Sequence, residues 1–216
     1  MKKIIFLGLL VVFLPATLFA QEKVESPAWN VGDKWAFTGD GSIEVSKADQ
    51  SGYILKFSDK NCSFESQGCN TVLFEKSTRN RINAVEGDKR QKYVMGLSKV
   101  LDFPFIAGKQ WKSAYSETMV GWSGNKTIYD YSEFFKVLGW DDVQVRAGKF
   151  KALKLECKRV LASSSHGGGD IGKEFKNHYW YSPDAKYFVK CQYDKDWMKQ
   201  DNKIFNWELT SFQLKK

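Results

Sequence analysis

An alternating stretch near the middle of the chain constrains its fold more than any other feature. From Leu153 to Lys158, leucine and cysteine side chains alternate with charged ones. Successive side chains of a strand point to opposite faces, so a repeat of two predicts a half-buried β-strand. The wider stretch Phe134–Val160 predicts a strand, a short connection, a second strand, a tight turn at Ala147-Gly148-Lys149 and a third strand.

Similar short segments run through the rest of the chain. They are rich in aromatic and β-branched residues, and no long segment keeps the 3.6-residue repeat of a helix. Residues 21–216 are therefore expected to form a single all-β domain, mainly antiparallel, as a curved sheet, half-barrel or sandwich with at most short helices. The other expected strands are Val31–Phe37, Ser42–Ser46, Gly52–Phe57, Thr71–Lys76, Arg79–Val85, Lys89–Met95, Gln110–Thr118, Lys126–Leu138, Phe175–Tyr181, Lys186–Tyr193 and Lys203–Phe212.

Turn residues predict how some of these strands connect. Glu86-Gly87-Asp88 and Ser182-Pro183-Asp184-Ala185 each predict a hairpin between the flanking strands, and a further turn is expected near Gly121–Asn125. Leu101–Gln110 contains a proline and a glycine and is expected to be a connection. Short helices are left open at Phe103–Ala107 and Asp194–Lys203.

The first twenty residues have the pattern of a secretory signal peptide. Two lysines precede the apolar run Ile4–Leu14, Pro15 interrupts it, and Ala20 offers a small residue for cleavage. The apolar run is short for a membrane-spanning helix, so an uncleaved anchor is the weaker interpretation. The chain is therefore expected to be exported, to the periplasm or to the extracellular space.

The four cysteines all follow this segment. An even number of cysteines in an exported chain favours disulfide bonds. The expected pairs are Cys62–Cys69, which would close a small polar loop, and Cys157–Cys191, which would join two strands through a shared core face. A metal site would require more closely spaced thiolate ligands, so no metal and no other cofactor are expected.

Three motifs resemble those of a group of uncharacterised secreted bacterial β-domains. They are a V-G-D-x-W opening strand at Val31–Trp35, a V-x-V-x-A-G-x-F-x-A-x-K hairpin at Val143–Lys154, and a Y-W-Y-S-P hairpin at Tyr179–Pro183. The resemblance implies export and a curved antiparallel sheet, similar in outline to periplasmic lipoprotein-carrier half-barrels. It carries over no catalytic residue.

The sequence offers few groups for catalysis. His166 lies in a flexible Gly/Ser loop, where a Ser–His pair would lack a rigid third group and an oxyanion hole. His178 is expected in a strand. The neighbours Asp141 and Asp142 are expected in a solvated turn, because adjacent strand residues point to opposite faces and do not converge. An envelope hydrolase assembled from Asp141, His166 and His178 is the alternative hypothesis.

Charge and aromatic content point to binding instead. The net charge is +8, of which Lys2 and Lys3 contribute two, and the basic residues are interleaved with acids. No nucleic-acid motif accompanies them, so an envelope lipid, another anionic ligand or an envelope protein is the expected partner. Of the eight tryptophans, Trp122 and Trp197 in expected loops are the candidate ligand contacts.

These observations favour one function over two others. The first hypothesis is an exported, non-enzymatic β-domain that binds an apolar or anionic envelope ligand, or a protein partner, on the concave face of its sheet. The envelope hydrolase is the second. A small outer-membrane barrel is the third, and the charged residues on the expected outer faces argue against it.

Overall fold

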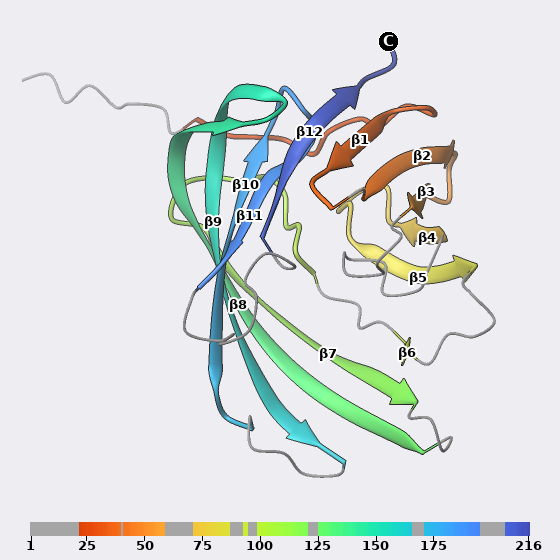
Figure 1. Ribbon diagram of the computed structural model, residues 1–216, viewed down its shortest axis with the longest axis vertical. Helices are drawn as coiled ribbons and strands as arrows, with labels where there is room; N and C mark the ends of the chain where they lie inside the picture. The colour runs from red at the N-terminus through yellow and green to blue at the C-terminus, as the bar shows by residue number, and fades with distance from the viewer. Residues whose placement is uncertain are drawn as a thin grey trace, which may run out of the picture.

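A computed structural model describes residues 22–39, 41–58, 71–86, 93–94, 99–120, 125–165, 171–194 and 206–216. Within them, twelve strands form one antiparallel sheet in the order β5-β4-β3-β2-β1-β12-β11-β10-β9-β8-β7-β6, which twists strongly (Figure 1). The described residues contain no helix. The predicted all-β, antiparallel fold class is confirmed. The strands are β1 (Lys34–Phe37), β2 (Ser42–Ala48), β3 (Tyr53–Ser58), β4 (Thr71–Phe74), β5 (Arg81–Glu86), β6 (Tyr93–Val94), β7 (Gln110–Val120), β8 (Lys126–Val145), β9 (Gly148–Ser164), β10 (Glu174–Ser182), β11 (Tyr187–Tyr193) and β12 (Trp207–Gln213).

Strand β12 joins two halves of the sheet. It pairs with β1 on one side, where Trp35 lies opposite Phe212, and with β11 on the other, where Cys191 lies opposite Trp207. The short strands β1–β5 lie at the upper right of Figure 1, and β10–β12 separate them from β8 and β9 in the sheet. Because β5 and β6 form the two edges, the sheet stays open and does not close into a barrel.

The central stretch forms fewer strands than predicted. The first two expected strands are one continuous strand, β8, interrupted by a bulge between Val137 and Gly139. Such a bulge inserts one unpaired residue, here Leu138, without ending the strand. The tight turn consists of Arg146 and Ala147, one residue earlier than predicted, and the chain re-enters the sheet at Gly148 with a φ of 136° that favours glycine.

The hairpin predicted at Glu86-Gly87-Asp88 is wrong. Strand β5 pairs with β4, whereas β6 pairs with β7, so the two strands around this signal form opposite edges of the sheet. Residues 87–92 lie outside the described part. A turn signal predicts a change of direction, but it does not determine which strand the next segment meets.

Two other predicted hairpins have the expected strand pairing, and most of the turn expected near Gly121–Asn125 lies outside the described residues. Strand β7 pairs with β8 along its whole length, and β10 pairs with β11 around residues 183–186. The connection at Leu101–Gln110 contains one isolated bridge, in which Phe105 pairs with Val24, and Phe103–Ala107 is not helical. Most of the second position left open for a helix, Asp194–Lys203, lies outside the described residues.

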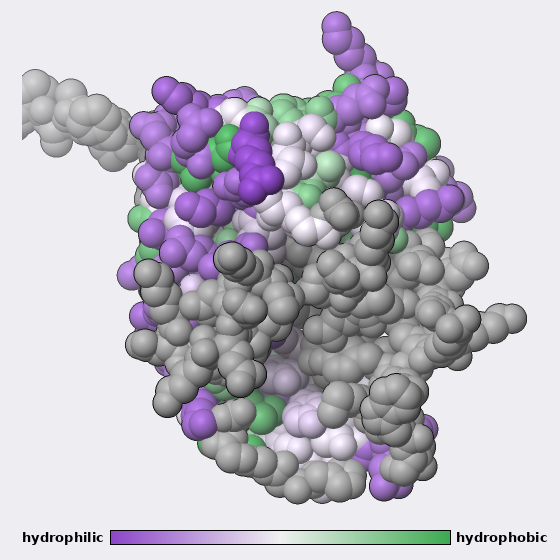
Figure 2. Space-filling view, viewed as in Figure 1, coloured by the Kyte–Doolittle hydropathy of each residue, from purple (hydrophilic) through white to green (hydrophobic). Residues whose placement is uncertain are grey.

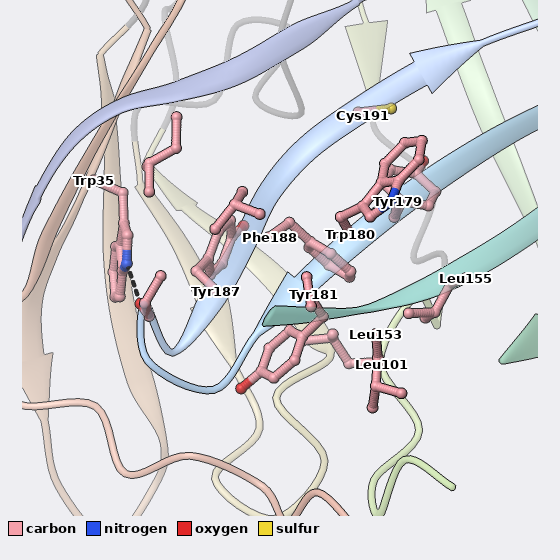
Figure 3. Close-up of a cluster of buried hydrophobic side chains, with 14 of the residues drawn as sticks. Trp35, Leu101, Leu153, Leu155, Tyr179, Trp180, Tyr181, Tyr187, Phe188 and Cys191 are labelled. Carbon is pink, nitrogen blue, oxygen red and sulfur yellow. Dashed lines mark hydrogen bonds between the residues drawn. The ribbon is translucent and has the colours of Figure 1, made fainter. Parts of the chain in front are cut away.

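Two tryptophans anchor the β10–β11 turn to the start of the sheet. The Trp35 indole Nε1 donates a hydrogen bond of 2.6 Å to the Ala185 carbonyl, and the Trp29 indole donates one of 3.0 Å to the Lys186 carbonyl. Figure 3 shows the first bond as a dashed line, with the ring of Tyr187 close by. Both indoles are buried, so these bonds satisfy groups that would otherwise be costly to remove from water.

Asp33 ties the beginning of the sheet to its last strand. Its side chain is fully buried and accepts hydrogen bonds from the backbone N–H groups of Asn30, at 2.8 Å, and Lys215, at 2.6 Å. The Asn30 side-chain amide also donates to the Lys215 carbonyl at 2.8 Å. The opening motif at Val31–Trp35 therefore has an architectural role, because its Asp and Trp hold different parts of the chain together.

The expected Cys157–Cys191 disulfide is absent. Both side chains are buried, but β10 lies between β9 and β11, with Cys157 opposite Asn177 and Cys191 opposite Tyr179. Two strand spacings of about 4.8 Å separate the backbones by more than the roughly 7 Å that a disulfide tolerates. A shared core face was correctly predicted, but the two strands are not neighbours. The expected Cys62–Cys69 bond lies outside the described residues.

Replacing Asp33 with alanine should lower the free energy of unfolding by about 2–4 kcal/mol, because the part-buried N–H groups of Asn30 and Lys215 would lose a charged acceptor. Urea unfolding followed by tryptophan fluorescence measures this. The matched control is Glu44→Ala, which removes a solvent-exposed carboxylate 3.7 Å from Lys34 and should change stability by less than about 0.5 kcal/mol. Equal effects of the two variants would contradict the proposed role of Asp33.

Candidate functional site

The predicted catalytic residues do not assemble into a site in the described structure. Asp141 and Asp142 lie within β8, opposite Ala152 and Lys151, and not in the expected turn. The Asp141 carboxylate accepts a hydrogen bond of 2.8 Å from the Trp180 indole. The predicted residues His166, Trp122 and Trp197 lie outside the described residues. The described partner of the Asp141 carboxylate is therefore the Trp180 indole, which is not a catalytic group.

His178 lies on β10 near the carboxylate of Glu156. Its Nε2 is 3.7 Å from Glu156 Oε2. Burial lowers the pKa of His178, nearby Lys154 and Lys176 lower it further, and Glu156 and Asp194 oppose the shift. The imidazole is therefore mostly neutral near pH 7. A neutral base without a neighbouring nucleophile among the described contacts does not support the hydrolase hypothesis.

The described residues contain neither a candidate metal site nor a candidate membrane-spanning helix. No group of three or more His, Cys, Asp or Glu side chains lies together there in a way that could hold a metal ion. In the same part of the chain, no helix has the length and apolar character needed to cross a membrane.

A row of tyrosines lies on the face of β7 and β8 that continues the core, which we call the inner face. Tyr115 lies directly opposite Tyr131, and their rings stack with centroids 5.5 Å apart. Tyr129, two residues along β8, stacks on Tyr131 at 6.5 Å. All three rings are half-buried. We call these tyrosines, together with Glu133 and Arg159, the tyrosine strip.

An ion pair supports the strip from the neighbouring positions. Glu133 is 1% exposed, and its Oε1 accepts hydrogen bonds from Arg159 Nε at 2.8 Å and Nη2 at 2.7 Å. The Tyr115 hydroxyl donates to the same oxygen at 3.2 Å. The guanidinium also lies 5.5 Å from the centre of the Tyr131 ring, within cation–π range. This network holds the rings in place and neutralises both charges.

The register of β8 and β9 explains why Glu133 and Arg159 form an ion pair. Glu133 and Arg159 are direct partners across the two strands, so their side chains leave the sheet on the same face. That face continues into the core through Phe135, opposite Cys157. Along the inner face, the buried apolar core is therefore followed by the half-buried strip, which carries hydroxyl groups.

Glu133 and Arg159 were not among the residues predicted from the sequence. A signal was present: Glu133 occupies an apolar position in the alternation between Tyr131 and Phe135, and Arg159 follows Cys157 in the same way on β9. Ionisable residues at apolar positions of two adjacent strands are expected to pair, because a lone buried charge is costly.

The Cys157 thiol and the Tyr179 hydroxyl, beside the strip, are unreactive at neutral pH. Burial raises the pKa of the Cys157 thiol well above its usual value, and Glu133 adds to the shift. Burial likewise raises the pKa of Tyr179, whose hydroxyl accepts a hydrogen bond of 2.8 Å from the Asn177 side chain. Both groups stay protonated at neutral pH, and a protonated thiol is a poor nucleophile. The arrangement is suited to contact with a ligand and not to covalent chemistry.

Comparisons with known proteins give only distant likenesses. No protein-family model and no curated protein matches the chain. The structure is similar to that of the hypothetical lipoprotein YmcC from Escherichia coli (K12), with a TM-score of 0.42 and 7% identity over 87% of this chain and 89% of that one. It is also similar to a Bacteroides fragilis protein with a YmcC-like fold, with a TM-score of 0.39 and 11% identity over 88% and 99%. Likenesses this distant carry nothing over to function.

Replacing Glu133 with glutamine should lower the free energy of unfolding by about 2–3 kcal/mol, because Arg159 would keep its charge without a counter-ion. The value allows for the partial exposure of Arg159, which screens its charge. Urea unfolding measures it. The double variant Glu133→Gln with Arg159→Met should be more stable than the single variant. A double variant less stable than the single one would contradict the importance of the unpaired charge.

His178 should make stability depend on pH. Its pKa is lowered in the folded state, so the unfolded chain binds more protons between the folded pKa and the unfolded value of about 6.5. Stability should therefore be full above about pH 6.5 and fall as the pH decreases below it. Chemical unfolding at a series of pH values should give a flatter profile for His178→Gln than for the wild type. Identical slopes would contradict the shift.

Proposed function

We propose that the chain is an exported binding domain without catalytic activity of its own, which holds an apolar or amphipathic envelope ligand on the tyrosine strip. The proposal of export is supported by the signal-peptide pattern of Met1–Ala20. The proposal of binding is supported by one observation above all: three stacked, half-buried tyrosine rings continue the apolar core toward solvent on the inner face of β7 and β8.

Tyrosine suits an amphipathic ligand because its ring offers apolar contact and its hydroxyl a polar tip. In Figure 2, pale side chains of intermediate hydropathy are visible in the lower part of the molecule, where the far ends of β7 and β8 lie. A surface of intermediate hydropathy at the end of an apolar core matches a ligand that is itself partly apolar.

The ion pair beneath the strip favours an apolar ligand over an anionic one. Arg159 directs both Nε and Nη2 at a single oxygen of Glu133, so its charge is already compensated. An anion would have to compete with a buried carboxylate for this guanidinium. The apolar form of the ligand hypothesis is therefore the one we propose.

Native mass spectrometry of protein exported to a bacterial periplasm and purified without detergent tests this function. We expect a discrete added mass that disappears on denaturation. A bare chain that also fails to bind a fluorescent fatty acid would overturn the ligand proposal and would favour a protein partner, to be sought by pull-down.

Tyr131→Ser should weaken binding of the fluorescent fatty acid by about fivefold to tenfold, because one aromatic contact contributes about 1–1.5 kcal/mol. The matched control is Phe212→Ser, which removes an exposed aromatic ring from β12, outside the tyrosine strip. Titration at constant protein concentration measures both. If the two variants bind alike, the ligand does not lie on the tyrosine strip.

A further inference from the structure

Exposed apolar side chains gather on the face of β8 opposite the tyrosine strip, which we call the outer face. Ile128 and Phe134 alternate with the inner-face tyrosines and Phe135, and they are 45% and 44% exposed. The bulge residue Leu138 is 43% exposed. Single exposed apolar residues are ordinary, but these three share one strand face, as a row in which Asp130, Ser132 and Lys136 lie between them.

Lysines surround the middle of this row. Phe134 lies opposite Lys112 of β7 on one side and opposite Lys158 of β9 on the other. The Lys112 ammonium lies 4.8 Å from the centre of the Phe134 ring. Lys136, between Phe134 and Leu138 on β8, is exposed. We call Lys112, Phe134, Lys136, Leu138 and Lys158 the Lys–Phe patch.

Acidic residues also lie near the patch: Glu174 pairs with its Lys158, and Glu156 lies opposite its Lys136 across β8 and β9. Glu174 lies 3.7 Å from Lys158, and Glu156 lies 3.7 Å from Lys176. Asp130 accepts hydrogen bonds from the hydroxyls of Ser116 and Ser163. Lys112 and Lys136 are both exposed and have no carboxylate partner within salt-bridge distance in the described structure. Lys112 and Lys136 therefore leave positive charge beside Phe134 that no ion pair in the described structure compensates, whereas the charge of Lys158 is compensated by Glu174.

We propose that the Lys–Phe patch docks the protein on the surface of an anionic lipid bilayer. Phenylalanine and leucine side chains enter the boundary between headgroups and acyl chains, while lysines keep their ammonium groups among anionic headgroups. The opposite charge of such a membrane complements the patch, and the overall basic charge of the chain strengthens the attraction. A soluble polyanion would use the lysines alone and would not require the exposed phenylalanine.

The patch and the tyrosine strip lie on opposite faces of β8, so the two proposals succeed or fail separately. A domain docked through its outer face would keep its inner face directed away from the membrane plane. Ligand binding to the tyrosine strip would then remain available to a docked molecule.

Flotation of the processed, purified chain with lipid vesicles tests the docking. We expect binding to vesicles of one-third phosphatidylglycerol and two-thirds phosphatidylcholine, little binding to pure phosphatidylcholine, and release at about 0.5 M salt, where exposed charges are screened. Lys112→Gln combined with Lys136→Gln should weaken binding at least about tenfold, because each lysine near an anionic surface contributes about fivefold. Phe134→Ser should also weaken it.

The matched control replaces Lys56 and Lys76, two exposed lysines elsewhere on the surface, with glutamine. It has the same net charge as the patch variant and should bind nearly as well as the wild type. An equal loss of vesicle binding in both double variants would overturn the proposal, and so would vesicle binding that Phe134→Ser leaves unchanged. Either result would indicate a general polyanion contact. A dimer in light scattering that Phe134→Ser abolishes would overturn it as well, since the patch would then meet a second copy.

Discussion

The sheet depends on the hydrogen bonds that its first strand and the residues just before it make to distant parts of the chain. Trp35 and Trp29 bond the turn between β10 and β11, and Asp33 bonds the backbone just after β12. All these contacts join residues more than a hundred positions apart, and all are formed by buried polar groups. Because an unpaired buried polar group is costly, this small region stabilises one specific arrangement of strands.

The long strand β8 presents a different chemistry on each of its faces. Its inner face changes from Val137 and Phe135, in the core, to Glu133 and the tyrosines. Its outer face carries Phe134 and Ile128 among lysines. One strand thus supports both proposed contacts, and its length, interrupted only by a bulge, lets it extend beyond the core that the shorter strands cover.

Local alternation made much of the fold predictable. It located most strands, and turn residues located the β7–β8 and β10–β11 hairpins. Glu133 and Arg159 could have been found in the same way, because each interrupts an apolar alternation. The alternation could not show that β10 separates Cys157 from Cys191, or that β5 and β6 lie at opposite edges. Strand order depends on long-range pairing, which a repeat of two residues does not encode.

The position of β12 has a consequence for how the chain reaches its folded state. This strand comes last along the sequence, yet it lies between β1 and β11 in the middle of the sheet. Until it has been synthesised, β1 and β11 both present unpaired backbone edges, and the two halves have no common ladder. Closing so large a loop makes folding slow. The unpaired edges of β1 and β11, which are prone to aggregation, stay exposed until β12 pairs with them. A nascent chain of this topology therefore cannot complete its sheet before β12 has been made, and its unpaired edges stay accessible to chaperones until then.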